Sequence, residues 1–514
     1  MKEERIKRFL KVIPGFISWS MLLFLAALFV FKPIAVAITL IIYLIYWLCR
    51  LLYMSVLLAM AHRRISSKKN INWLDLCENL KSDKRFEDII HIVLYTVYKE
   101  PQQVIEDSLS VLKRVNYPKD KIIVALAGEE RDTNAFAKLE KAKGKFIEYF
   151  KDIIITIHPQ DIKGEIPGKG ANATFAAKRI KEVLEKEDYP LENVIISCFD
   201  ADTCPANDYF ACLTYHFLNN PKRHQTSFQP LPIYNNNIYF VPAFARVMEL
   251  GSTFWQMIES MRYEKVVTFS SHSMSFKTLV DVGYFPVDLV SDDSLIFWKC
   301  FLKFKGNYAT DFLEVPVYMD IAVGRNFFDT IAVQYRQKRR WAWGVETFVF
   351  LGSSLINNRH ISLSVKMRRL FQILDNHINW ATWSIIISFI TPLVLLWSRL
   401  VHQDSLVFFN LSYINSVIFN SLILILILCI FISKEFIPPR PNSVSRFIYL
   451  SFTLQWFLIP FISAFLGSLP ALDAQTRLMF NNRLGFYPTP KKRQDTNNVV
   501  QIKKQRRLLL LRFL

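Results

Sequence analysis

Val194–Pro205, VIISCFDADTCP, is the most informative stretch of this chain of 514 residues. Its apolar opening predicts a buried strand, and two carboxylates one residue apart, Asp200 and Asp202, follow at once. In an open α/β sheet, ligands bind beyond the carboxyl ends of the strands, and Asp-x-Asp there offers oxygens to a divalent cation that also holds phosphates. The alternative is a surface turn, because Asp and Pro both favour turns.

Strands and helices alternate around this stretch, from about residue 89 to 318. Short apolar runs are separated there by charged segments with helical spacing, which predicts a mostly parallel sheet covered on both faces. The predicted strands are Ile89–Tyr98, Lys121–Ala127, Ile153–His158 and Val194–Phe199, and the predicted helices are Gln102–Val115 and Ala171–Glu187.

Long uncharged runs flank this α/β region on both sides. Val12–Phe31 has no charged residue and Ile34–Ala61 has only Arg50, so we expect a hairpin of helices across a bilayer core of about 30 Å. The later predicted spans are Ile378–Trp397, Leu406–Ser433 and Phe447–Leu472.

The predicted organisation follows from these runs. A helix over Ile361–His377, with basic residues among apolar ones, is expected to lie in the membrane interface. Two spans before the domain and three after it place the tail outside, whereas its Lys and Arg favour the inside, so five or six spans both stay open. The predicted units are a hairpin (1–62), a catalytic domain (63–345), interfacial helices (346–377), further spans (378–472) and a basic cytoplasmic tail (473–514).

Composition favours a membrane protein with a large cytoplasmic part. Hydrophobic residues make up 52% of the chain, and the formal net charge is +19. Basic residues beside apolar spans are typical of the cytoplasmic membrane face, and no nucleic-acid recognition motif accompanies the charge. The seven cysteines form no Cys-x-x-Cys pair, which argues against a disulfide framework or a zinc site.

Several motifs surround the Asp-x-Asp pair. They are YTVYKEP (95–101), VALAGEERD (124–132), PGKGAN (167–172), VSDDS (290–294), QKRRW (337–341) and FYPTPK (486–491). Their order resembles that in the membrane-integrated family-two glycosyltransferases, the group of cellulose, chitin and hyaluronan synthases, over nearly the whole chain. The resemblance implies a GT-A-like α/β cytosolic domain, inserted between transmembrane helices, that uses a nucleotide sugar.

The first motif resembles the family's nucleotide-holding loop. Thr96, Tyr98 and Glu100 match that loop, while Tyr95 and Lys99 stand where relatives have Pro and Asn. The resemblance therefore implies that these three matching residues contact the nucleotide, and an ordinary strand-to-helix turn is the alternative.

The second and third motifs resemble further parts of the nucleotide-sugar site. Relatives place an acidic residue against the base at the end of the next strand, where this chain has Glu129, Glu130 and Asp132, and we take Glu130 as the candidate. The glycines of the third motif let the backbone approach a ligand, and Lys169 supplies positive charge for phosphate ahead of a helix N-terminus.

VSDDS resembles the family's Thr-Glu-Asp motif. Alignment on that motif makes Asp293 the base that takes the proton of the acceptor hydroxyl, with Asp292 beside it. Two adjacent carboxylates are also expected to raise one another's pKa. The alternative is a solvated helix start with Ser291 as N-cap and both acids in the first turn.

QKRRW fits the family's Gln-x-x-Arg-Trp signature. On a helix, Gln337, Arg340 and Trp341 share one face and present an amide, a guanidinium suited to pyrophosphate and an indole able to stack on a sugar. The alternative is a basic helix that contacts lipid. FYPTPK keeps the Phe, Thr and Lys of the family's gating loop, which closes over bound nucleotide.

Together the resemblance implies an inverting, processive polysaccharide synthase of the plasma membrane. Asp200 and Asp202 would bind Mg²⁺ or Mn²⁺ and the diphosphate of the donor, which is a UDP-sugar rather than a GDP-sugar in this interpretation. The expected partners are a glycan or lipid-linked acceptor and membrane lipids, with no nucleic acid. Transfer of one sugar to a lipid carrier and a non-catalytic nucleotide receptor are the alternatives.

Overall fold

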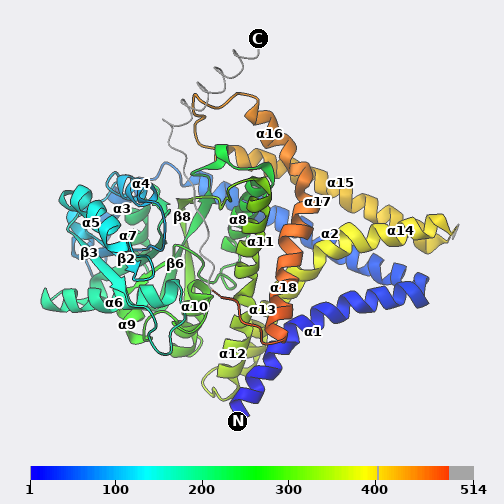
Figure 1. Ribbon diagram of the computed structural model, residues 1–514, viewed down its shortest axis with the longest axis horizontal. Helices are drawn as coiled ribbons and strands as arrows, with labels where there is room; N and C mark the ends of the chain where they lie inside the picture. The colour runs from blue at the N-terminus through cyan, green and yellow to red at the C-terminus, as the bar shows by residue number, and fades with distance from the viewer. Residues whose placement is uncertain (1, 402–404, 486–514) are drawn as a thin grey trace.

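The computed structural model describes residues 2–401 and 405–485. Figure 1 shows an α/β domain on one side and a fan of long helices, including α1 (Lys2–Phe31) and α2 (Pro33–Ser67), on the other. The predicted gating loop 486–491 and the rest of the basic tail lie outside the described residues.

A mixed sheet forms the centre of the α/β domain. Its strands lie in the order β3-β2-β1-β4-β7-β6-β8-β5. The first four are parallel, β7 is antiparallel to both of its neighbours, and β6 and β8 are parallel. All four predicted strands are confirmed. The bounds are β1 Ile90–Thr96, β2 Ile122–Glu129, β3 Asp152–His158, β4 Val194–Asp200, β5 Cys204–Pro205, β6 Thr226–Tyr234, β7 Ser273–Ser275 and β8 Ala309–Met319.

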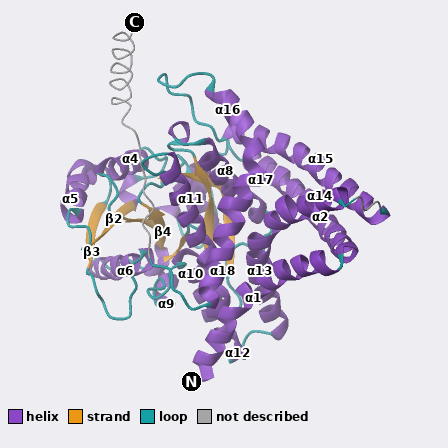
Figure 2. Ribbon diagram, turned by 45° about the vertical axis from the view of Figure 1, so that its right-hand side comes forward, coloured by secondary structure: helices purple, strands orange, loops and turns teal. Residues whose placement is uncertain are grey.

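Helices cover both faces of the sheet, because its strands are apolar on both sides. Figure 2 shows helices on both sides of the strands. Along β1, Val93 and Tyr95 belong to one core and Ile92 and Leu94 to the other, as the period of two requires. The first core is closed by α3 (Trp73–Glu78), α4 (Gln102–Leu112), α5 (Ala135–Phe146) and α7 (Tyr209–Asn219), and the second by α6 (Lys169–Lys186), α9 (Phe276–Asp281) and α10 (Asp292–Lys303). The two predicted helices correspond to α4 and α6.

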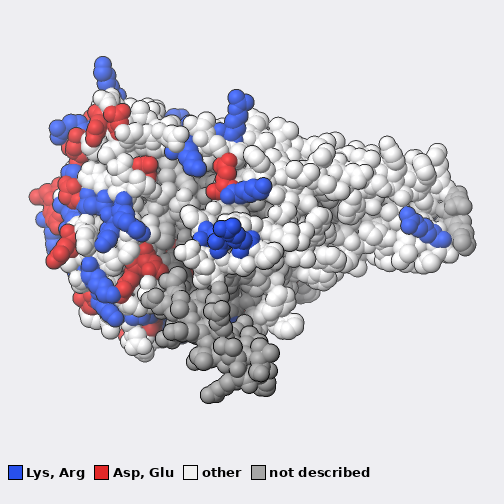
Figure 3. Space-filling view, turned by 90° about the horizontal axis from the view of Figure 1, so that it is seen from above, with Lys and Arg blue, Asp and Glu red and all other residues white. Residues whose placement is uncertain are grey.

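Five helical stretches among the described residues are long and apolar enough to span a membrane. Two precede the α/β domain and three follow it, in agreement with the predicted runs. Figure 3 shows charged side chains gathered over the α/β domain, while the projecting helices are almost uncharged except near their tip. The stretches are Glu3–Phe31, Pro33–Ser67, Leu363–Leu400, Leu406–Glu435 and Ile448–Met479.

The predicted interfacial segment 361–377 forms the first part of α13 (Leu363–Ile385), which runs on into α14 (Thr391–Leu400). Its position in a lipid interface stays a prediction. The helix α11 (Phe327–Ala342) packs against α18 (Leu469–Met479) and against α8 (Ala243–Ser260), which lies on β6. The helix that carries QKRRW therefore lies at the boundary between the sheet and the long apolar helices.

Candidate functional site

Parallel pairing brings two predicted site residues together at the carboxyl edge of the sheet. Thr96 ends β1 and lies in register with Asp200, which ends β4. The Thr96 hydroxyl donates a hydrogen bond of 3.4 Å to the carbonyl oxygen of Phe199. The nucleotide loop and the Asp-x-Asp pair therefore meet at one edge, as the strand order requires.

Asp202 is enclosed by protein rather than exposed on a turn. Its side chain has no exposed surface, and its Oδ2 accepts a 2.8 Å hydrogen bond from the backbone N–H of Asp320. The Asn236 amide donates to the Asp202 carbonyl oxygen at 3.2 Å. The surface-turn alternative is therefore wrong for this residue, because a buried carboxylate needs such partners.

Lys169 joins the Asp-x-Asp pair to the later aspartate. Its ammonium lies 3.0 Å from Asp200 Oδ1 and 2.9 Å from Asp293 Oδ1. Burial opposes its charge, but the two carboxylates outweigh burial and keep the pKa of Lys169 well above its ordinary value. Gly170 permits this approach, since a Cβ there would lie 2.1 Å from the Pro286 carbonyl oxygen.

Asp292 and Asp293 open α10, with Ser291 at the N-cap position. The solvated-start alternative is wrong for Asp292, which is only 7% exposed. Burial, and then the neighbouring Asp293 carboxylate, raise the pKa of Asp292 to about 8. The charge of Arg340 acts on Asp292 in the opposite sense, so QKRRW lies within electrostatic range of the aspartates.

Sequence reasoning missed the segment that precedes β7. Thr268 donates a 2.6 Å hydrogen bond to the backbone carbonyl of Asp293, and Ser270 donates one of 2.8 Å to Asp200 Oδ2. The run of small polar residues from 270 to 273 was the available signal. This segment therefore hydrogen-bonds both aspartates that Lys169 contacts.

The QKRRW helix places its indole among other aromatic rings. Trp341 lies 6.0 Å from the Tyr234 ring and 5.5 Å from Phe269, edge to face with the latter. The ammonium of Lys338 lies 3.5 Å from the centroid of the Trp341 ring, which is a cation–π contact. Gln337 is 8% exposed.

The basic residues of this helix have different surroundings. Lys338 is fully buried and forms a 2.8 Å ion pair with Glu249, and Arg339 pairs with Asp473 at 2.8 Å. The lipid-contact alternative is therefore wrong for these two. Among the residues that the structure describes, Arg340 makes no hydrogen bond or ion pair, which leaves its half-buried guanidinium available for a ligand.

The nucleotide loop is held by local hydrogen bonds. Glu100 Oε2 accepts a 2.5 Å bond from the backbone N–H of Tyr98, and the Arg131 guanidinium lies 4.8 Å from the Tyr98 ring. Lys99 has a left-handed φ of 64°, and its N–H donates to Asp132 at 3.1 Å. Asp132 thus shapes the loop from the next strand.

The acidic residues at the end of β2 are separated by the fold. Glu129 is buried and paired with Arg131, whereas Glu130 is exposed and accepts a 2.9 Å bond from the Gln160 N–H. The predicted base contact at Glu130 stays a prediction.

Negative charge predominates where these motifs converge. We call this group the aspartate cluster; it consists of Lys169, Asp200, Asp202, Asp292 and Asp293. The carboxylates of Asp200, Asp292 and Asp293 all act on the Lys169 ammonium. Burial is the main cause of the raised pKa of Asp292, and the carboxylates of Asp293 and Asp200 raise it further. Carboxylate oxygens in excess of cations are a donor set that fits Mg²⁺ or Mn²⁺.

A second buried group of charges lies elsewhere, between α7, β8 and the end of α2. The ligand atoms of Cys212, His216 and Glu314 lie within 4.8 Å of one another. However, both ring nitrogens of His216 already contact carboxylates, and Glu314 also binds two cationic side chains. This group is therefore an ion-pair network. We call it the His216 network; it consists of Arg64, Lys68, Cys212, His216, Asp311 and Glu314.

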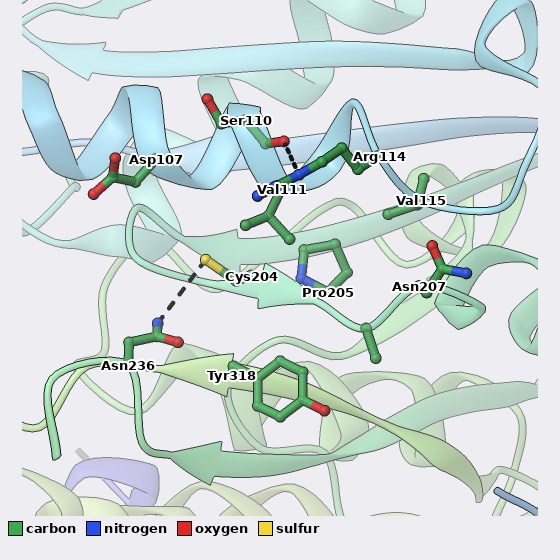
Figure 4. Close-up of a pocket in the computed structure, with 11 residues that line it drawn as sticks. Asp107, Ser110, Val111, Arg114, Val115, Cys204, Pro205, Asn207, Asn236 and Tyr318 are labelled. Atoms are coloured by element: carbon green, nitrogen blue, oxygen red, sulfur yellow. Dashed lines mark hydrogen bonds between the residues drawn. The ribbon is translucent and has the colours of Figure 1, made fainter. Parts of the chain in front are cut away.

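A cavity of about 540 Å³ lies beside the turn that carries Asp202 (Figure 4). It is formed between α4 and β5, where Asn236 donates to the Cys204 sulfur at 3.9 Å. None of the predicted site residues lines it. The cavity therefore flanks the aspartate cluster without being part of it.

A carboxylate-rich edge of a mixed sheet, facing an Arg–Trp helix beside membrane-length helices, defines a membrane-associated glycosyltransferase of the GT-A-like type. The chain belongs to glycosyl transferase family group 2, whose family model matches residues 195–466. The resemblance seen in the sequence is thereby confirmed.

Known relatives are polysaccharide synthases by name. The poly-beta-1,6-N-acetyl-D-glucosamine synthases of Staphylococcus aureus strains COL and MRSA252 are each 24% identical to this chain over 273 residues, 52% of this chain and 57% of the relative. The chain thus spans little more than half the length of these relatives.

Two solved structures are similar to this chain at lower sequence identity than these relatives. The mannosyltransferase PcManGT from Pyrobaculum calidifontis, in complex with GDP-Man and Mn²⁺, has a TM-score of 0.43 and 13% identity over 82% of this chain and 98% of its own. Residues 1–349 of Staphylococcus aureus TarS have a TM-score of 0.36 and 12% identity over 58% of this chain and 74% of that one.

Proposed function

We propose that this protein is an inverting glycosyltransferase that extends a polysaccharide from a nucleotide sugar at the cytoplasmic membrane face. One observation carries the proposal: the Lys169 ammonium contacts both Asp200 and Asp293, so the donor-binding and proton-accepting carboxylates share one site. The name of the relatives, poly-beta-1,6-N-acetyl-D-glucosamine synthase, supports transfer of an N-acetylhexosamine, and we propose a UDP-sugar as its donor.

The chemical step assigns a role to each polar group. Asp293 takes the proton of the acceptor hydroxyl while that oxygen attacks the anomeric carbon. The bond from that carbon to the diphosphate breaks, and the nucleoside diphosphate leaves with the bonding electrons. Arg340 stabilises the charge of the departing diphosphate, for which its planar guanidinium is suited. Lys169 adds positive charge beside the donor.

Asp200 and Asp202 are the residues that would hold Mg²⁺ or Mn²⁺, with support from the carboxylate excess described above. When bound, the cation neutralises charge on the diphosphate. Thr96, Tyr98, Glu100 and Glu130 would contact the nucleotide, because they follow β1 and β2 at the same sheet edge.

Trp341 would bind the acceptor sugar, with Gln337 beside it. Support comes from its place on α11, which packs against the membrane-length stretch that ends in α18. A growing glycan leaving this site would therefore enter the apolar helices directly, which favours processive synthesis with extrusion. Arg63 and Arg64 are basic residues at the end of α2 and favour the cytoplasmic side for the α/β domain. The membrane that we propose is the plasma membrane.

The deciding experiment uses the full chain in lipid nanodiscs with Mg²⁺ or Mn²⁺ and a panel of UDP- and GDP-sugars. We expect nucleotide release with one UDP-sugar and a product of gel size. A single-sugar lipid product would favour the carrier-lipid alternative, and nucleotide binding without any transfer would favour a receptor.

The matched control compares two Asp→Asn changes. Asp293→Asn removes the proposed base, whereas Asp281→Asn makes the same change at an exposed pair with Lys277. Loss of turnover in the first variant alone is the expected outcome. Equal turnover in both variants would overturn the assignment of Asp293.

A further inference from the structure

Glu346 carries an unusual set of hydrogen bonds for a residue outside the predicted motifs. It begins α12 (Glu346–Ile356) and is 8% exposed. Its Oε1 accepts bonds of 3.0 Å from the backbone N–H groups of Val290 and Ser291, and its Oε2 accepts one of 2.8 Å from the Trp343 indole N–H. One carboxylate therefore holds two separate segments.

Each of the two segments leads directly into the proposed site. Val290 and Ser291 precede Asp292 and Asp293, which open α10. The Ser291 hydroxyl does not cap that helix. The position of the helix start is therefore fixed by Glu346 from outside.

The other segment follows the QKRRW helix. Trp343 comes two residues after Trp341 and three after Arg340, in the short turn of helix Trp343–Val345 that joins α11 to α12. Trp343 is 3% exposed and Val345 is fully buried, so this connection is held by packing. A contact at Trp343 is thus transmitted to the indole and guanidinium of the site.

Burial of the Glu346 carboxylate disfavours its charged form. Burial raises its pKa, although the bonds from Trp343, Ser291 and Val290 act in the opposite direction. A glutamine has the same shape without the charge, but its NH₂ group would face the Trp343 N–H donor to donor.

We propose that Glu346 is a positioning residue that sets the distance between the base Asp293 and the Arg340–Trp341 pair. The inference rests on the proposed function, because it assigns no chemistry of its own to Glu346. In this proposal the Glu346 carboxylate fixes how the base, the leaving group and the acceptor are aligned, although it contacts none of them.

The test measures transfer and nucleotide binding for Glu346→Gln in nanodiscs. We expect kcat to fall about tenfold to a hundredfold, as for other residues that orient catalytic groups. The Kd of the nucleoside diphosphate should change much less than kcat, by about twofold, since Lys169, Asp200 and Asp202 supply the other proposed donor contacts and are not held by Glu346. The matched control is Glu259→Gln, which should keep wild-type kcat: Glu259 lies near the end of α8 and is also 8% exposed, but it is paired with Arg262.

A second pair of variants separates positioning from general destabilisation. Trp343→Phe removes the indole donor. If the two residues act through this one contact, the double variant Trp343→Phe/Glu346→Gln should have a kcat no lower than that of the less active single variant. Hydrogen exchange of the peptide covering residues 288–296 should rise in Glu346→Ala and not in Glu259→Ala.

Three outcomes are distinguishable. A wild-type kcat in Glu346→Gln, or a loss confined to nucleotide binding, overturns this inference while the proposed function stands. Unchanged hydrogen exchange in Glu346→Ala also overturns it. A wild type that transfers no sugar overturns the proposed function, and the positioning role falls with it.

Discussion

The aspartate cluster and the His216 network are both buried groups of charge, yet they are balanced in opposite ways. In the His216 network, Glu314 contacts Arg64, Lys68 and His216 at 2.6–3.1 Å. In the aspartate cluster, Lys169 is the ammonium that contacts Asp200 and Asp293.

The pKa values follow this balance. Burial would raise the pKa of Glu314, but its cationic partners outweigh burial and hold that pKa well below the ordinary value. Burial would likewise lower the pKa of His216, whereas hydrogen bonds to Asp311, Cys212 and Glu314 raise it to about 12. In the aspartate cluster the carboxyl group shifts the other way from Glu314: the pKa of Asp292 is raised to about 8, by burial first and then by the Asp293 carboxylate.

The difference supports the proposal that the aspartate cluster binds a ligand. A neutralised group of buried charges is complete without a ligand and fastens α2 to the α/β domain. An uncompensated group is costly unless a cation binds, which is typical of functional sites.

The largest expected effect is on turnover at the aspartate cluster. Asp293→Asn should reduce kcat by about 10²–10⁴, because an amide cannot accept the proton. The melting temperature should change little: the variant loses the ion pair between Lys169 and Asp293, but Lys169 keeps its pair with Asp200 and the repulsion between Asp293 and Asp292 is removed. If Asp293→Asn instead lowered the melting temperature and kept its turnover, the aspartate cluster would be structural like the His216 network, and the contrast between them would be wrong.

Glu314→Gln should show the reverse behaviour. Arg64, Lys68 and His216 are only partly buried, so leaving them without the buried Glu314 carboxylate is expected to cost about 1–3 kcal/mol of unfolding free energy, measured by denaturant titration of the full chain in detergent. Turnover per folded molecule should stay near that of the wild type. Loss of turnover at unchanged stability would contradict a purely structural network.

The pH dependence of stability sharpens the contrast. Between its ordinary pKa of 3.8 and about 8, Asp292 keeps a proton in the folded state that the unfolded chain has lost. Stability should therefore fall as pH rises through this window and level off above about pH 8.

Asp292→Asn removes this titration. Between about pH 6 and 8, the melting temperature of the wild type should fall by roughly 2–4 °C more than that of the variant. Parallel curves for the two proteins would show that Asp292 is ionised in the folded state throughout.

The smallest effect is expected at an exposed pair. Arg179 and Glu182 lie 2.6 Å apart with side chains 59% and 53% exposed. Arg179→Ala should change the unfolding free energy by less than about 0.5 kcal/mol and leave transfer unchanged. A larger change would mean that burial is not what separates the two clusters from ordinary surface charge.

Much of this fold could be predicted because its signals are local. The apolar runs that became β1, β2, β3 and β4 are periodic within a few residues, and the alternation with helices implied the parallel order. The resemblance assigned both Thr96 and Asp200 to the nucleotide-sugar site, and the structure has them in register at one edge of the sheet.

The contacts that complete the site could not be predicted in this way. Ser270 lies 70 residues from Asp200, Lys338 lies 89 from Glu249, and Glu346 lies 55 from Ser291. None of these pairs has a spacing that marks it, because each depends on how helices pack against the sheet.

The sequence by itself determined which segments form strands, which helices are apolar enough for a membrane and which residue types carry the chemistry. Local periodicity and composition decide these features, since they reflect burial of neighbouring side chains. Only the tertiary structure decided that Lys169 contacts Asp293, 124 residues away, and that the carboxylates of Asp200, Asp292 and Asp293 all act on one ammonium. Charge balance is a property of neighbours in space, and the chain order does not contain it.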